Sequence, residues 1–265
     1  MYFSFGSLQS DLPDLDNTGL LVANNTVALP GGYSSVRNIA EISGALNGVC
    51  SGGIFVRDEE GNPLLFAGTA DKLYAIDYTM ALEDISSTAY NTPADGGWEF
   101  VQYGDRLIAT NLGDNVQTYQ VGVDTDASDL YGDNFKAKHV AIVKDFVVYA
   151  HTIDDADGEQ AKRVRWTALG DPTSITISAT TQSDFQPLEG SGTGGDIRRL
   201  IGGEYGIIIQ ENAIWRMTYI GSPSVFQFDE VEKNKGTRYS GSIAASGSNI
   251  IYLGSDGFYL FNGSF

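Results

Sequence analysis

Side chains suited to acid–base or metal chemistry are few and widely scattered in this sequence. It has two histidines, His139 and His151, and one cysteine, Cys50. His139 precedes the apolar run 140–143 and His151 follows the run 146–149, so we expect both at strand edges rather than in a site. The sequence has no Gly-x-Ser-x-Gly elbow and no Walker loop. Its Gly-rich segment 191–196 lacks the preceding strand and following helix of a dinucleotide fingerprint, so we interpret it as a loop between repeated units. These patterns assign no catalytic residue and no cofactor, while the abundant serines and aspartates leave a triad assembled by the fold open.

Two clusters of acidic residues could offer oxygen ligands to a hard cation such as calcium. The first lies in DLPDLDN (11–17) and the second in DDADGE (154–159). The second lacks the twelve-residue spacing of a calcium loop with its final bidentate glutamate. We therefore expect acidic turns exposed to water and assign no metal, with a calcium site as the alternative. The acids concerned are Asp11, Asp14 and Asp16 in the first cluster and Asp155, Asp157 and Glu159 in the second.

The charge of the chain is strongly negative and unevenly distributed. There are 16 basic and 34 acidic residues, a net charge of −18. Residues 1–135 hold 4 basic and 19 acidic side chains, a net of −15, whereas residues 136–265 hold 12 and 15, a net of −3. Such a chain cannot bind nucleic acid by neutralising its phosphates. The acidity indicates either a solubilising surface or a surface that must not retain DNA passing nearby.

A repeated unit explains the positions of the large aromatic residues. The stretch GEYGIIIQENAIWRMTY (203–219) consists of an apolar run, a polar turn and an apolar-aromatic segment, and four other stretches have the same form. The aromatic residues are separated by 45, 47, 49 and 44 positions. We expect them to be core residues of five copies of one unit. They are Tyr74, Tyr119, Trp166, Trp215 and Tyr259.

Each unit has the pattern of a small antiparallel sheet. Short runs rich in Ile, Val, Phe and Tyr are separated by Gly- and Asp-containing turns, which suit tight hairpins. The second strand of each unit is predicted at 64–67, 107–110, 146–150, 206–210 and 249–253. A further apolar segment precedes each copy, and extended pieces such as 174–180 and 224–231 supply a fourth strand.

A four-stranded unit repeated every 44–49 residues is typical of a β-propeller blade. The sequence therefore predicts an all-β fold: a β-propeller of about five recognisable units over residues 51–265, preceded by an extended N-terminal arm over residues 1–50. A large two-sheet sandwich is the alternative. Only residues 36–46 have apolar residues at the spacing of a helix. A structured loop is the alternative for this segment. The outer strand of the fifth unit could come from residues 1–5 or from another subunit.

A family resemblance accompanies these repeats. The segments FGSLQSDLPDLDNTGLLVANN, GGYSSVR, LFAGTADKLYAI, YGDRLIATN, KDFVVYAHT, RVRWTALGDPTSI, QSDFQPL, GGEYGIIIQENAIWRMTYIG, FQFDEVEKNKGT and LGSDGFYLFNG resemble, in this order, one group of proteins. These are the tailed-phage virion proteins related to the packaged-DNA stabilisation and tail-hub (nozzle) proteins of short-tailed phages. The most specific parts are 166–172 and 202–228. Members of that group are generally longer.

The resemblance implies a non-enzymatic tail protein of the virion. The resemblance implies a ring, with a hexamer as the expected size, below the portal and its adaptor. The ring would contact tail fibre or other tail proteins and let genomic DNA pass without specific binding. An acidic wall would repel that DNA, so we expect four acids of the first half to line the channel or its rim. They are Asp95, Glu99, Asp105 and Asp114. The alternative function is a propeller lectin or glycosidase acting on host surface glycan.

Overall fold

The computed structural model describes residues 6–10, 12–13, 15–17, 19–29, 32–36, 40–41, 43–132, 134–190 and 194–262. The chain folds as two compact units, residues 1–42 and 43–265. The division falls eight residues before the predicted boundary between 50 and 51. Residues 43–50 belong to the second unit, where the backbone N–H of Asn47 donates a hydrogen bond to the Tyr74 hydroxyl over 3.2 Å.

The N-terminal unit contains a short hairpin and a single strand bridge. Strand β1 (Thr26–Leu29) pairs antiparallel with β2 (Gly32–Ser35), with Leu29 opposite Gly32. Leu8 and Leu20 form the isolated parallel bridge. None of the described residues of this unit is buried, so its described part forms no hydrophobic core.

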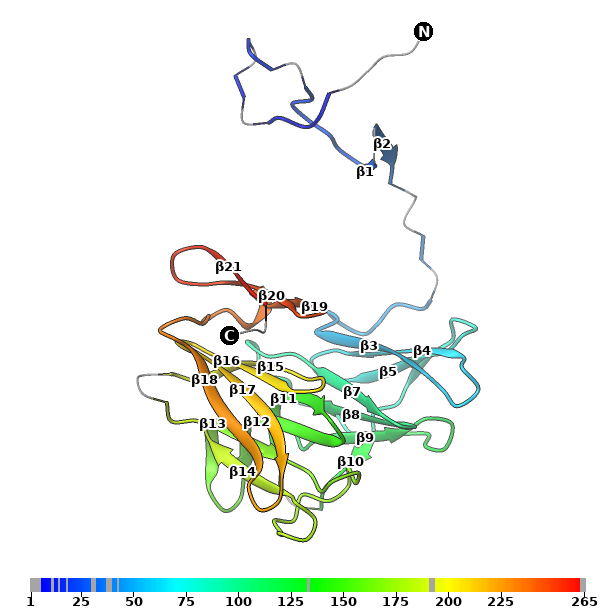
Figure 1. Ribbon diagram of the computed structural model, residues 1–265. Helices are drawn as coiled ribbons and strands as arrows, with labels where there is room; N and C mark the ends of the chain where they lie inside the picture. The colour runs from blue at the N-terminus through cyan, green and yellow to red at the C-terminus, as the bar shows by residue number, and fades with distance from the viewer. Residues whose placement is uncertain are drawn as a thin grey trace. The chain divides into compact units, whose positions relative to one another are not determined.

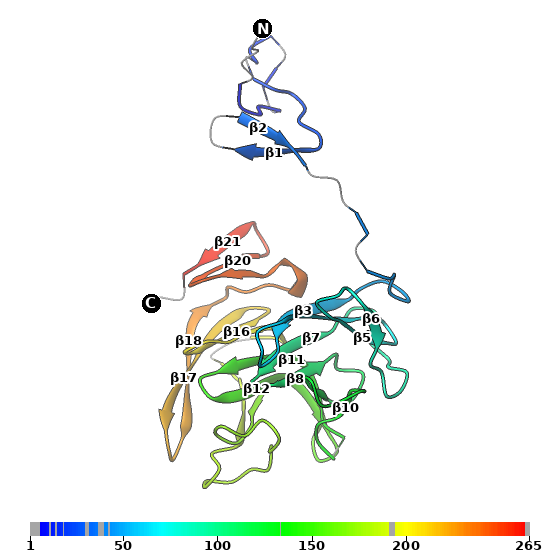
Figure 2. The same ribbon diagram turned by 90° about the vertical axis from the view of Figure 1, so that its right-hand side faces the viewer.

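The second unit contains five antiparallel sheets built from consecutive strands, which Figures 1 and 2 show following one another around a common centre. Blade 1 is β3 (Gly52–Arg57), β4 (Pro63–Gly68), β5 (Leu73–Ile76) and β6 (Leu82–Asp84). Blade 2 is β7 (Glu99–Tyr103), β8 (Arg106–Thr110), β9 (Gln117–Gln120) and β10 (Ser128–Asp129). Blade 3 is β11 (Lys136–Val143), β12 (Phe146–Asp154), β13 (Gly158–Trp166) and β14 (Asp184–Pro187). Blade 4 is β15 (Ile197–Ile201), β16 (Gly206–Gln210), β17 (Ala213–Gly221) and β18 (Val225–Lys233), and blade 5 is β19 (Ala244–Ser246), β20 (Asn249–Leu253) and β21 (Phe258–Phe261).

The chain is therefore an all-β, five-bladed β-propeller preceded by N-terminal strands. The predicted second strands are confirmed as β4, β8, β12, β16 and β20. In every blade the aromatic residue of the repeat lies on the third strand, directly opposite a residue of the second. The opposed pairs are Ala67 with Tyr74, Leu107 with Tyr119, Val148 with Trp166, Ile208 with Trp215, and Tyr252 with Tyr259.

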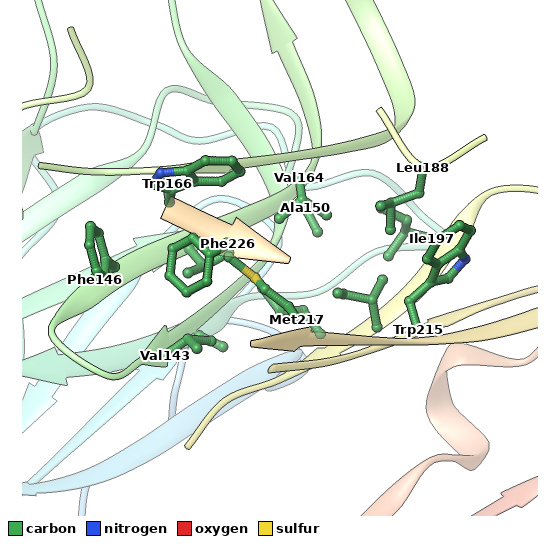
Figure 3. Close-up of a cluster of buried hydrophobic side chains, with 14 of the residues drawn as sticks. Val143, Phe146, Ala150, Val164, Trp166, Leu188, Ile197, Trp215, Met217 and Phe226 are labelled. Carbon is green, nitrogen blue, oxygen red and sulfur yellow. The ribbon is translucent and has the colours of Figure 1, made fainter. Parts of the chain in front are cut away.

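Neighbouring blades pack through shared apolar clusters, because each sheet presents alternate side chains to its two faces. One cluster joins blades 1 and 2, another blades 2 and 3, a third blades 3 and 4, and a fourth blades 4 and 5. Figure 3 shows the third cluster, where Trp166 of blade 3 meets Phe226 and Met217 of blade 4. The ring centroids of Trp166 and Phe226 are 5.2 Å apart. None of the apolar clusters found among the described residues joins blade 5 to blade 1.

The fourth strands of the blades differ in part from the prediction, and one predicted donor strand lies outside the described residues. The fourth strand of blade 3 is β14 at 184–187, and residues 174–180 form a loop instead. The backbone groups of that loop bond locally: the N–H of Ala168 donates to the carbonyl of Ser174, and that of Leu169 to Thr181. The predicted strand 224–231 is confirmed by β18. Blade 5 has three strands, and the proposed donor of a fourth, residues 1–5, lies outside the described residues.

Helical structure is almost absent from the described part of the chain. Its helical element is one 3₁₀ turn, η1 (Ser240–Ser242). The described residues within 36–46 are not helical, and 37–39 and 42 lie outside the description. No described helix is long and apolar enough to cross a membrane.

Candidate functional site at the mouth of the propeller

Three ionisable side chains from three successive blades meet at the centre of the propeller. Glu99 begins β7, His139 lies within β11, and Arg199 lies within β15. These are the first strands of blades 2, 3 and 4, and they are neighbours around the axis. The innermost strands thus bring together residues that are up to one hundred positions apart in the sequence.

Both carboxylate oxygens of Glu99 are engaged by the protein. Oε1 lies 2.7 Å from Nη1 of Arg199 and 2.9 Å from Nδ1 of His139. Oε2 accepts a hydrogen bond from the backbone N–H of Val140 over 3.3 Å. The carboxylate therefore links blade 2 to blades 3 and 4 through charged and polar contacts.

The neighbours of Glu99 keep it ionised. Burial alone would raise the pKa of this carboxyl, but the His139 ring and the Arg199 guanidinium lower it to below its usual range. At neutral pH the site therefore contains a carboxylate held between a guanidinium and an imidazole.

His139 is the most enclosed member of the cluster. Its side chain is 2 % exposed, and its Nε2 is buried without a hydrogen-bond partner. Nδ1 faces the Glu99 carboxylate, so Nε2 is the ring nitrogen that lacks a partner. The ring is thus held inside the propeller rather than presented to solvent.

Two cavities lie along the axis at this cluster. The first, of about 260 Å³, is lined by charged and polar side chains that include Asp95, Glu99, Lys138, His139 and Arg199. The second, of about 480 Å³, shares Arg199 and is lined mainly by apolar residues of the innermost strands and of the segment leading into β19. The mouth of the propeller is therefore polar, and the next part of its axis is apolar.

The four acids expected to line a channel do not gather in one place. Asp95 lines the same cavity as Glu99 and lies, largely exposed, 4.0 Å from Nζ of Lys138. Asp105 sits in the turn between β7 and β8 and accepts a hydrogen bond from Gln120. Asp114 lies between β8 and β9 and accepts hydrogen bonds from the backbone of Asn91 and the side chain of Asn111. Only Asp95 and Glu99 therefore share the mouth.

Four of the five repeated aromatic residues, Tyr119, Trp166, Trp215 and Tyr259, belong to the apolar clusters, and Tyr74 is buried outside them. Tyr74, Trp166 and Trp215 are buried, and Tyr119 and Tyr259 are partly buried. The Trp166 indole donates to the carbonyl of Gln182 over 2.7 Å. The Trp215 indole donates to the side chain of Gln210, also over 2.7 Å. These indoles therefore have hydrogen-bond partners within the protein.

The acidic sequence 154–159 is the tip of the β12–β13 hairpin, and residues 155–159 are exposed, as expected. Its carboxylates contact cationic and polar side chains of the protein. Asp154 and Asp157 both bind the buried Arg163, over 2.6 and 2.8 Å. The described residues contain no group of three or more His, Cys, Asp or Glu side chains that could hold a metal ion. In the other acidic cluster, Asp11 and Asp14 lie outside the described residues.

The other histidine is also buried, so the expectation of strand-edge histidines is wrong for both. His151 lies inside β12 at a β-bulge, with a backbone φ of +55°. Its Nε2 is 2.7 Å from Glu159, and its Nδ1 is buried without a partner. Burial lowers the pKa of His151, and the contact with Glu159 offsets only part of that effect. At neutral pH this contact is therefore a hydrogen bond from a neutral ring.

A further cavity of about 330 Å³ opens between blades 4 and 5. It is lined by the loop from Asn234 to Tyr239 and by residues of both adjacent blades. Lys235 lies 4.3 Å from the centroid of the Tyr259 ring and 2.5 Å from its hydroxyl, which donates to Asp256 over 2.6 Å. Tyr259 therefore links Lys235 and Asp256, two of the four charged residues that line this cavity.

Sequence reasoning missed the partners of Glu99. A histidine within the apolar run of β11 was a signal that could have indicated a buried, partnered ring. Arg199, in the first strand of the next unit, gave no signal that it would reach blade 2.

Comparisons with known proteins give fold-level likenesses at low identity. No protein-family model matches the chain, and no curated protein sequence matches it. Among solved structures, the extracellular domain of the one-component system BT4673 from B. thetaiotaomicron is 15 % identical over 83 % of this chain, with a TM-score of 0.48. This chain spans 32 % of that protein.

Two other structures have similar scores. BamB from Moraxella catarrhalis is 9 % identical over 90 % of this chain and 67 % of its own, with a TM-score of 0.46. Virginiamycin B lyase from Staphylococcus aureus is 13 % identical over 78 % of this chain and 68 % of its own, with a TM-score of 0.43. Such low values carry no information on function. The five-bladed propeller is evident from the sheet order and the blade-to-blade clusters.

Proposed function

We propose that the chain is a structural component of a phage tail, a hub or nozzle protein that forms a ring below the portal and its adaptor. In this role it extends the DNA channel, retains the packaged genome and later lets it pass. The family resemblance of the sequence is the starting point of the proposal. The observation that carries it furthest is an apolar surface suited to assembly.

That surface lies on the two terminal blades. In blade 5 the side chains facing away from blade 4 include Ile251, Phe258 and Leu260, and all three are exposed. In blade 1 the face turned away from blade 2 carries exposed Phe55 and Leu65, which lie opposite each other. Contiguous exposed apolar side chains usually mark an interaction surface. A protein that works as one subunit of a larger assembly needs such surfaces.

The ionic cluster at the mouth is consistent with a structural role. Both carboxylate oxygens of Glu99, a residue of blade 2, contact residues of blades 3 and 4. These contacts stabilise the packing of the three blades around the axis. A carboxylate used in this way has little capacity left to activate a substrate. The cluster therefore supports a rigid channel component better than a hydrolytic centre.

The acidic charge fits a passage for DNA. A basic wall would retain the duplex through counterion release, whereas an acidic wall repels it within about 8 Å at physiological salt. Because Glu99 is engaged by Arg199 and His139, the largely exposed Asp95 is the best placed of the four acids for the rim of the channel. Asp105 and Asp114 lie in other turns and stay candidates for other parts of the channel wall. A density map of the assembled ring tests this point: Lys and Arg side chains along the lumen would contradict it.

A propeller lectin or glycosidase acting on host surface glycan is the second candidate. The carboxylates of Asp95 and Glu99 at one polar cavity favour it. Binding of glycans to the purified protein, abolished by Asp95→Asn at unchanged thermal stability, would support this candidate over the structural one.

Negative-stain imaging of the purified chain, alone and with a portal–adaptor complex, tests the structural proposal. We expect closed rings in at least one of these samples and no glycan hydrolysis. Monomers in both samples, together with glycan binding at the mouth, would overturn the proposal in favour of the second candidate.

A further inference from the structure

The polar cavity between blades 4 and 5 is separate from the mouth of the propeller. Its volume of about 330 Å³ falls within the range of small-molecule sites, which begins at about 300 Å³. Among the described residues, it shares no lining residue with either axial cavity. Three segments form its walls: the β16–β17 turn, the loop 234–239 and the β20–β21 turn.

The loop 234–239 is held tightly against blade 4. Gly236 lies so close to this blade that an added Cβ would be 2.2 Å from the carbonyl oxygen of Gln210. The N–H of the buried Thr237 donates a hydrogen bond to the same carbonyl over 3.2 Å. The Thr237 hydroxyl accepts one from the N–H of Tyr239 over 3.0 Å. The backbone of this wall is therefore fixed without a ligand, which lowers the ordering cost of binding.

Three of the four charged residues that line the cavity are paired within the protein. The Tyr259 hydroxyl accepts a hydrogen bond from Lys235 and donates one to Asp256, so these two opposite charges lie on one network. Glu211 forms an ion pair with Arg198. The charges of these residues therefore balance, and they form a fixed polar part of the walls.

Three other side chains of the cavity are not used by the fold, and all three lie on the loop 234–239. None of the ion pairs or hydrogen bonds between described residues involves the Arg238 guanidinium or the Asn234 amide, and both residues are exposed. Tyr239 is 60 % exposed. The site thus offers one positive charge in excess, an amide and an accessible aromatic ring, although the chain has a net charge of −18.

We propose that this cavity binds an acidic sugar, a hexuronic acid residue, with its carboxylate on Arg238 and its ring on Tyr239. A guanidinium binds a carboxylate through two parallel N–H···O hydrogen bonds. The C–H groups of a sugar ring can pack on an aromatic face. The sugar hydroxyls both donate and accept hydrogen bonds, as does the Asn234 amide. A phosphate dianion fits less well, because the Asp256 carboxylate in the wall would repel it.

This site adds ligand binding to the proposed structural role and does not depend on the ring. It also differs from the second candidate function, which places a glycan at the mouth beside Asp95 and Glu99. The cavity between blades 4 and 5 binds the sugar without cleaving it, since its carboxylates are engaged by Tyr259 and Arg198.

Binding of D-glucuronic acid to the full-length protein tests the site. Saturation-transfer NMR detects the contact, and titration gives the dissociation constant. Glucose has the ring without the carboxylate, and acetate has the carboxylate without the ring. We expect glucuronic acid to bind at least about tenfold more tightly than either compound. Inorganic phosphate is the third comparison, and phosphate that binds as tightly as glucuronic acid would overturn the assignment of a sugar.

Two variants with matched controls locate the site. Arg238→Gln and Tyr239→Ala should each weaken the binding of glucuronic acid at least about tenfold. Lys162→Gln removes another exposed cation that has no ion pair among the described residues. Tyr78→Ala removes another tyrosine, which is 61 % exposed. Both controls should bind like the wild type, and circular dichroism melting checks that all four variants are folded.

Other results overturn the inference in distinguishable ways. Unchanged binding in Arg238→Gln and Tyr239→Ala would contradict the site. Binding that is lost in Asp95→Asn but kept in Arg238→Gln would place the sugar at the mouth and support the second candidate function. A wild-type protein that does not bind glucuronic acid would overturn the inference, while the proposed ring, which imaging tests separately, would still stand.

Discussion

Arg199 donates a hydrogen bond to Glu99 over 2.7 Å, although one hundred residues separate them in the sequence. The contact spans the first strands of blades 4 and 2, and His139 of blade 3 binds the same carboxylate oxygen. The centre of the propeller is thus held by a polar contact, while the blades pack through apolar ones.

Removing the charge of Glu99 should destabilise the fold. Glu99→Gln leaves the Arg199 guanidinium without its counter-charge and replaces the charged acceptor that faces the buried His139 ring. Because Arg199 is 41 % exposed, we expect a cost of about 1.5 kcal/mol, between the values of an exposed pair and of a buried one. Urea unfolding measures the loss. Glu204→Gln is the matched control, because Glu204 is exposed and contacts only Lys144 among the charged groups. A difference below about 0.5 kcal/mol between the two variants would show that the cluster contributes no more than an exposed pair.

The His151 ring should make stability depend on pH in the weakly acidic range. Because burial lowers its pKa, the unfolded chain binds a proton near pH 6.5 while the folded chain does not. Unfolding is therefore favoured as pH falls below about 6.5, with a slope of up to about 1.4 kcal/mol per pH unit until the folded ring also titrates. Denaturation curves between pH 5 and 8 should show a flatter slope for His151→Gln. An unchanged slope would assign the effect to other groups.

The two repeated tryptophans should be essential to stability. Trp166 packs against Phe226 and Phe228, and Trp215 lies in the same cluster between blades 3 and 4. Either change to Ala should cost about 3–5 kcal/mol, because it leaves a large cavity in a packed core. Chemical denaturation of each variant gives this value. Val123→Ala, at an exposed position, should change stability by less than about 0.5 kcal/mol.

The Asp154 carboxylate should be more important to stability than its place near a loop tip suggests. It binds the buried Arg163 over 2.6 Å and also contacts Arg165, so Asp154→Asn leaves a buried guanidinium partly unpaired. We expect a loss of about 3 kcal/mol. Asp155→Asn is the control, since the exposed Asp155 binds only the Asn134 amide among the contacts described for it. Equal effects of the two variants would refute the role of Asp154. For the same reason, replacing 154–159 by a two-residue turn should destabilise the hairpin.

Chelation should leave the melting temperature unchanged. The acids of the 154–159 hairpin are engaged by Arg163, His151 and Asn134, which replace a cation as their partners. Scanning calorimetry with and without EDTA checks this, with added calcium as the reverse experiment. A shift of several degrees in opposite directions would indicate a cation site.

The architecture could be predicted from the sequence because local sequence patterns determine each blade. Alternating apolar runs, Gly–Asp turns and the aromatic period define each hairpin within about twenty residues, so β16 and β20 were predicted with their observed bounds. The fourth strands were harder. Residues 174–180 have strand-like composition, yet their backbone groups bond within a loop, and β14 begins at Asp184.

The mouth of the propeller could not be predicted in the same way. The contact of Glu99 with His139 and Arg199 depends on how three blades are rotated around the axis, and no local pattern encodes that rotation. His139 was assigned to a strand edge because the sequence does not show that β11 starts at Lys136 and so includes the ring. Glu99 was predicted as a site residue only because it is acidic. The same criterion gave Asp105 and Asp114, which lie in turns away from the cluster.

Five blades joined by four apolar clusters give the two ends of the series a different status from the middle. Among the described residues, blade 3 shares an apolar cluster with the blade on each side, whereas blades 1 and 5 each share a cluster with one other blade. Stacked units of this kind open from their least supported members. Amide protons of β12 should therefore exchange with solvent most slowly, and those of β20 and β21 among the fastest. A partner molecule that covers blade 5 would slow this exchange. The exchange rates of the β20 and β21 amides therefore test whether blade 5 is covered in the proposed assembly.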